Sequence, residues 1–90
     1  MANQEQVRTF LEKELQRVFE DRFLWANAAF HEALGFGKTK EAATAYYNMV
    51  EARRALQTLY EDMRLWHPSN GNIKVEMVLA WREGKLTRIP

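Results

Sequence analysis

The fold is decided by residues 39–66, whose sequence is TKEAATAYYNMVEARRALQTLYEDMRLW. Apolar residues recur in this stretch at alternating intervals of three and four, which is the spacing of a heptad seam along one face of a helix. The seam consists of Ala42, Ala45, Met49, Ala52, Leu56, Leu59, Met63 and Trp66. Every seam position is apolar, so the stretch predicts a helix over about 39–66 with one continuous face for packing against another helix.

The preceding segment, from about residue 4 to residue 34, contains neither Gly nor Pro and is rich in helix-forming residues. Its apolar residues also follow steps of three or four, so it predicts a second long helix, although a break near Glu20 and Asp21 stays open. These residues are Val7, Leu11, Leu15, Val18, Phe19, Phe23, Ala26, Phe30 and Leu34. The short connection at 35–37, Gly-Phe-Gly, predicts that the two helices form an antiparallel hairpin.

From Ile73 to Arg82, every second residue starting with Ile73 is apolar, and this alternation predicts a strand. A turn at Glu83 and Gly84 and a second strand over 85–89 would complete a small β-hairpin over about 73–89. The predicted fold class is therefore mainly α, a long antiparallel helical hairpin with a small C-terminal β-hairpin. The alternative is a three-helix, all-α fold with a third helix from residue 72 to residue 83, because Val78 and Ala80 are apolar on the face that a strand would expose.

Length and composition restrict the class of protein. Ninety residues suffice for a single domain spanning 1–90. The absence of cysteine excludes disulfides and thiolate metal sites. The net charge of +1 is too balanced to indicate nucleic acid as a partner of the whole chain. No window approaches the ~20 consecutive apolar residues of a membrane span, and no basic segment followed by an apolar run opens the sequence. We therefore expect a cytoplasmic protein that does not associate with membranes.

No motif predicts catalysis, a cofactor or a bound metal. Ser69 is the only serine, and no residue pattern supplies it with a base. His31 lacks the carboxylate three residues earlier that helical metal sites use, since Ala28 occupies that position. Gly37-Lys38-Thr39 resembles the end of a phosphate-binding loop, but Glu32 stands where that loop requires glycine. We expect a protein that is not an enzyme.

The function that these features favour is a small protein-binding module, such as an adaptor, regulator or inhibitor, that forms a homo-oligomer through its second helix. The predicted self-association residues are Met49, Ala52, Leu56, Leu59, Met63 and Trp66. Arginine and aromatic residues are enriched where proteins bind proteins. The predicted partner-binding residues are Tyr46, Arg53, Arg54, Trp81, Arg82, Lys85 and Arg88.

Two alternatives belong to other functional classes. The basic and aromatic residues of 81–88 also suit nucleic acid, because aromatic rings stack on bases and arginines contact phosphates. A small anionic, nucleotide-like ligand could instead bind near Lys38 and Lys40, where free backbone N–H groups begin the second predicted helix.

Overall fold

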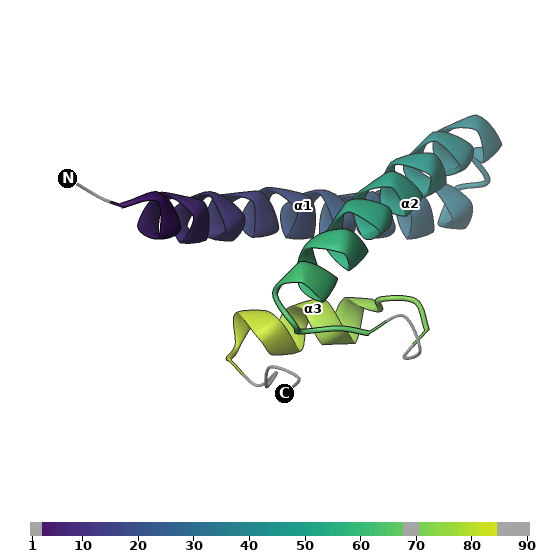
Figure 1. The fold of residues 1–90 in the computed structure, drawn as a ribbon. Helices are drawn as coiled ribbons and strands as arrows, with labels where there is room; N and C mark the ends of the chain where they lie inside the picture. Colours follow the sequence, from purple (N-terminus) through teal and green to yellow (C-terminus); the bar gives the residue numbers. More distant parts are fainter. Residues whose placement is uncertain (1–2, 68–70, 85–90) are drawn as a thin grey trace.

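The computed structural model describes residues 3–67 and 71–84, and within these ranges it contains three helices and no strand. The helices are α1 (Gln4–Gly35), α2 (Thr39–Asp62) and α3 (Val75–Arg82). As Figure 1 shows, α2 folds back across the C-terminal half of α1, and α3 lies beside the middle of the molecule. The predicted antiparallel hairpin of two long helices is confirmed, and α1 runs unbroken through Glu20 and Asp21.

Both ends of α1 are stabilised by local hydrogen bonds. At the start, the Asn3 side chain accepts from the Gln6 backbone N–H, and the Gln6 side chain accepts from the Asn3 N–H, which forms a capping box. At the end, the N–H of Lys38 donates to Ala33 and that of Gly37 donates to Leu34. This pattern is a Schellman motif, and it needs a left-handed residue that glycine supplies at φ +69° at Gly37.

The seam predicted on residues 39–66 forms the core of the hairpin. Seven of its eight residues are buried, and the eighth, Leu59, packs against the core. Phe23 and Ala26 of α1 face the seam from the other side. The registration of the two helices is shown by the ring contact of Phe30 with Tyr46 at 5.4 Å and by the hydrogen bond between Tyr60 and Glu20. Phe30 therefore lies beside Tyr46 and Glu20 lies beside Tyr60, as expected for two antiparallel helices.

Helix α2 ends at Asp62, four residues before the predicted boundary. The N–H of Leu65 donates to Tyr60 and that of Arg64 donates to Glu61, so a second Schellman motif closes this helix. Arg64 adopts a φ of +60°, a conformation in which glycine is usual. The seam residues beyond this point, Met63 and Trp66, remain buried although they lie outside the helix.

The predicted C-terminal β-hairpin at 73–89 is wrong for the part that the structure describes, because residues 75–82 form a helix. The alternative, a third helix in an all-α fold, fits. Val78 is fully buried and Leu79 is exposed, which reverses the two faces that strand alternation assigned to them. Helical spacing places Val75, Val78 and Arg82 on one side of α3, toward the rest of the molecule. The second predicted strand, 85–89, lies outside the described residues.

The first part of α1, residues 4–15, lies outside the portion of the helix that is packed. No side chain of α1 before Gln16 is buried. At ~1.5 Å per residue, the 32 residues of α1 span about 48 Å, close to the 51 Å longest dimension of the molecule. The helix therefore extends well beyond the part that α2 and α3 cover, as Figure 1 shows.

Candidate protein-binding surface

The residues predicted to mediate self-association lie inside one copy of the chain. Met49, Ala52, Leu56, Met63 and Trp66 are buried among the three helices, and Leu59 is half-buried against them. A second copy could reach these side chains only if the hairpin opened. The seam therefore accounts for the stability of the hairpin, and a binding surface has to be sought on the exposed faces.

The predicted partner-binding residues of α2 are exposed or half-buried. Tyr46 is exposed, with its ring against Phe30. Arg54 is exposed and pairs with Glu51 at 4.0 Å, and Arg53 is half-buried.

Two of the predicted C-terminal partner-binding residues, Trp81 and Arg82, are described by the structure, and both make contacts within the chain. Trp81 packs against the core. Arg82 forms ion pairs with Glu20, at 3.2 Å, and with Asp21. Trp81 is half-buried and Arg82 is engaged in these ion pairs, and Lys85 and Arg88 lie outside the described residues.

A buried polar cluster joins the three helices where they meet. Glu20 is buried, and its carboxylate accepts hydrogen bonds from Gln16 at 3.0 Å, from the hydroxyl of Tyr60 at 2.5 Å and from Arg82 at 3.2 Å. Burial, together with the bond to Glu20 and its negative charge, raises the pKa of Tyr60 well above its usual range. The hydrogen bond to Asp21 raises the pKa of Arg82. Among the described residues, every buried side-chain nitrogen and oxygen has a partner.

This cluster was not predicted from the sequence. One available indication was the four-residue spacing of Gln16 and Glu20, which places an amide beside a carboxylate on one helical face. The cluster links α3 to α1 through the contacts of Arg82 with Glu20 and Asp21.

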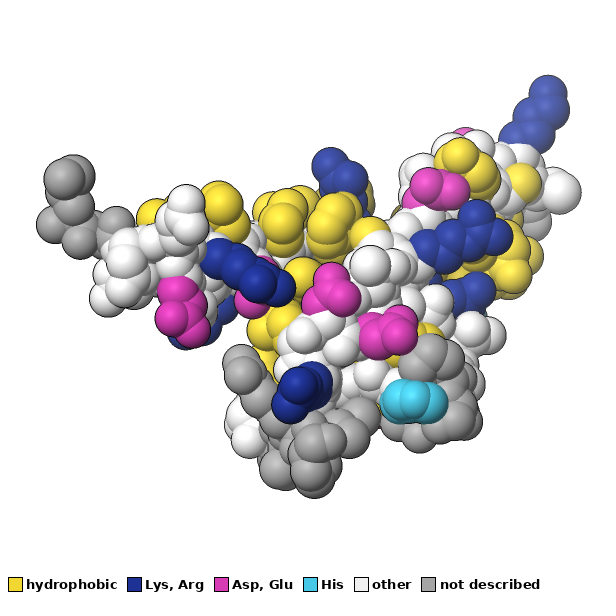
Figure 2. Space-filling view, in the orientation of Figure 1, with side chains coloured by type: hydrophobic (Ala, Val, Ile, Leu, Met, Phe, Trp, Pro, Cys, Tyr) yellow, Lys and Arg dark blue, Asp and Glu magenta, His cyan; other side chains and the backbone are white. Residues whose placement is uncertain are grey.

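A stripe of exposed apolar side chains follows α1. We call Val7, Leu11, Leu15, Val18 and Trp25 the α1 stripe. Leu11, Val18 and Trp25 are each seven residues apart, so their positions around the helix drift by only about 20° per step. Trp25 is 82% exposed and Leu11 is 52% exposed, and exposed apolar side chains are informative when they lie together on one face. Figure 2 shows hydrophobic side chains along the edge of α1 that faces away from α3.

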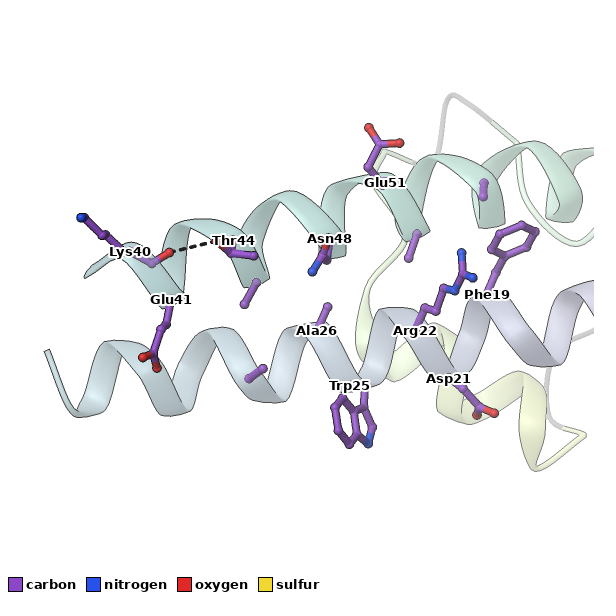
Figure 3. Close-up of a pocket in the computed structure, with 14 residues that line it drawn as sticks. Phe19, Asp21, Arg22, Trp25, Ala26, Lys40, Glu41, Thr44, Asn48 and Glu51 are labelled. Carbon is purple, nitrogen blue, oxygen red and sulfur yellow. Dashed lines mark hydrogen bonds between the residues drawn. The ribbon is translucent and has the colours of Figure 1, made fainter. Parts of the chain in front are cut away.

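The stripe leads into a groove between α1 and α2, with a volume of about 960 Å³. Small side chains form much of its surface, namely Ala26 and Ala29 on α1 and Ala45, Ala52 and Ala55 on α2. In the close-up of Figure 3, Phe19 and Arg22 point toward α2, whereas Trp25 projects from the opposite side of α1. Glu41 and Asn48 of α2 point toward α1. Alanines in such a groove permit another backbone to approach closely.

The stripe and the groove form one continuous surface. Trp25 belongs to both, and Ala29 follows it by one helical turn. From Val7 to Ala29 the surface extends for 22 residues of helix, or about 33 Å. Apolar surfaces of this extent on a small protein commonly mark sites of protein interaction.

The positions considered for an anionic ligand, Lys38 and Lys40, lie at the start of α2. Lys38 pairs with Glu41 at 3.8 Å, and Lys40 lies at the end of the groove. Within residues 3–67 and 71–84, no group of three His, Asp or Glu side chains is arranged to hold a metal ion.

Among the described helices, none combines the length and the apolar character that crossing a bilayer requires. Comparison of the chain with protein-family models, with curated proteins and with solved structures found no match.

Proposed function

We propose that this protein is a small helical protein-binding module whose binding surface consists of the α1 stripe and the α1/α2 groove. The surface would accept an amphipathic helix, the mode in which apolar side chains at helical spacing enter a groove between two helices. An adaptor, regulator or inhibitor would act through such contacts.

The observation that carries the proposal is the free N-terminal half of α1. Residues 4–15 form about three turns of helix without a buried side chain. A solitary helix of this length is only marginally stable in water, because most helical stability in proteins comes from packing of an apolar face. Val7, Leu11 and Leu15 supply such a face and find no neighbour among the described residues. A partner helix would supply the missing contact.

Photo-crosslinking can test the surface in the cells that produce the protein. A photoreactive phenylalanine analogue would replace Val18 or Trp25 on the surface, and Tyr47 in a control variant. Tyr47 is also exposed and apolar, but it does not line the groove. We expect the first two positions to crosslink to one helical segment of a polypeptide, at residues spaced three or four apart.

Comparison with the control at position 47 defines the outcome that would contradict the proposed function. If positions 18 and 25 crosslink no more than position 47, then the stripe and the groove are not a binding surface and the proposed function is wrong.

A further inference from the structure

We infer that the helix occupying this surface is α1 of a second copy of the chain, lying antiparallel to the first α1 across a two-fold axis at Val18. The inference rests on the proposed function, because it names the partner of the same surface. It also moves the interface between copies from the buried seam of α2 to the exposed face of α1.

The first argument is the spacing of the apolar residues about Val18. In two antiparallel helices related by a two-fold axis at residue 18, positions whose numbers add to 36 lie level with each other. Val7 of one copy then lies level with Ala29 of the other, and Leu11 lies level with Trp25. Val18 meets its own equivalent. All five of these residues share one face of α1 and are accessible in the single copy.

The second argument is the difference in side-chain size between the two halves of that face. The N-terminal half carries the branched side chains Val7, Leu11 and Leu15, each of which is about half exposed. The C-terminal half borders the groove at Trp25 and Ala29, and five alanines are among the residues that line the groove. An antiparallel second copy places the branched half of each α1 beside the groove of the other. The face is self-complementary, as an interface with two-fold symmetry requires.

The charges favour the same arrangement. Glu14 of one copy comes level with Arg22 of the other, and Arg22 points into the groove. The two-fold axis produces this opposite-charge pair twice. A parallel arrangement would set Glu14 against Glu14 and Arg22 against Arg22, and it would leave both grooves empty. Juxtaposed like charges disfavour an interface, so the antiparallel dimer is the arrangement that the charges select.

The extent of the surface is close to that of a stable dimer interface. Eighteen residues per copy belong to the stripe or line the groove, just below the 20–30 residues a side of a standard interface. The four helices contributed by two hairpins would then form a bundle around the two α1 helices, a common way to bury helical apolar faces.

The mass of the protein in solution, measured by light scattering on a sizing column over a wide range of concentration, tests the dimer. We expect twice the 10.6 kDa of the single chain. Val18→Asp places two carboxylates at the two-fold axis and should weaken dimerisation by at least about a hundredfold. Val18 is 45% exposed in the single copy, so this variant should retain its helical circular dichroism. Leu79→Asp, at an equally exposed residue of α3, should remain dimeric.

Disulfide trapping tests the direction of pairing, because the natural chain contains no cysteine. Val7→Cys and Ala29→Cys variants should form a mixed disulfide when combined, and each should crosslink poorly to itself. Self-crosslinking of Val7→Cys without the mixed product would show parallel pairing and overturn the inference.

A mass of one chain at every concentration would also overturn it. In that event, crosslinking from positions 18 and 25 to a different polypeptide would leave the proposed function standing. Absence of crosslinking from these positions would contradict both the dimer and the proposed function.

Discussion

At the scale of single residues, Glu20 is the most informative position in the molecule. Its buried carboxylate accepts hydrogen bonds from side chains of α1, α2 and α3, so this one side chain contacts all three helices. Burying a charge is costly unless it is paired and hydrogen-bonded, and a register that misplaced Tyr60 or Arg82 would leave Glu20 without these partners. The cluster therefore selects one arrangement of the helices over others that bury similar apolar area.

The hydroxyl of Tyr60 makes stability depend on pH in the alkaline range. Its pKa is raised in the folded protein, whereas tyrosine in an unfolded chain titrates near 10. The folded state therefore holds a proton that the unfolded state releases above about pH 10. The stabilisation is complete below that pH and is lost as pH rises further, by at most about 1.4 kcal/mol per pH unit.

Urea unfolding of the wild type and of Tyr60→Phe between neutral pH and about pH 11.5 measures this effect, with Tyr46→Phe as the control at an exposed tyrosine. We expect the alkaline loss of stability to be smaller in Tyr60→Phe alone. Parallel stability profiles for all three proteins would contradict the role assigned to the Tyr60 proton.

At the scale of elements, α3 shows why alternation can mislead in a short segment. Ile73, Val75, Met77, Leu79 and Trp81 occupy alternate positions, as in a half-buried strand. The same stretch also contains apolar residues at helical spacing, and an eight-residue element satisfies either period with few mismatches. Packing against α1 and α2 decides between them, because Arg82 reaches Glu20 and Val78 reaches the core only from a helix.

Substitutions at two adjacent residues distinguish helix from strand in α3. Val78→Ala should lower the free energy of unfolding by about 2 kcal/mol, because Val78 is fully buried. Leu79→Ala should change it by no more than about 0.5 kcal/mol, since Leu79 is 45% exposed. Chemical denaturation measures both values. A strand would reverse the order, so a larger loss for Leu79→Ala would contradict the helical assignment.

At the scale of the whole molecule, α1 divides into a covered half and an uncovered half. Phe23 and Ala26 contribute to the core, whereas Val7 and Leu11 face outward. The apolar positions of α1 do not keep a strict seven-residue period, so the apolar face shifts around the helix along its length. One half of α1 therefore packs within the hairpin, and the other is available to a partner.

Hydrogen exchange should reveal this division and its dependence on concentration. At low concentration the amides of residues 4–15 should exchange much faster than those near Phe23 and Ala26, because a solitary helix opens readily. Raising the concentration should slow exchange in residues 4–15, since dimerisation stabilises the folded helix by mass action. Uniform protection along α1 at every concentration would contradict this account.

The sequence by itself determined the two long helices, their connection and the face of α2 that forms the core. These features follow from local rules: helix-forming composition, a glycine where the chain must turn, and apolar residues at steps of three and four. The end of α2 did not follow, because Arg64 takes the left-handed position without being glycine. The candidate surface was visible in the sequence only as part of a longer apolar pattern on α1.

Only the tertiary structure decided which apolar residues are used within the chain and which remain exposed. The heptad seam and the α1 stripe look alike in the sequence, since both are apolar residues at helical intervals. The seam is buried because the short connection folds α2 back onto α1. Val7 and Leu11 stay exposed because α2, with 24 residues, covers only part of the 32-residue α1, and Trp25 stays exposed because it projects from the side of α1 opposite α2. The lengths of the helices and the direction of the turn between them therefore decide which of these apolar residues are buried.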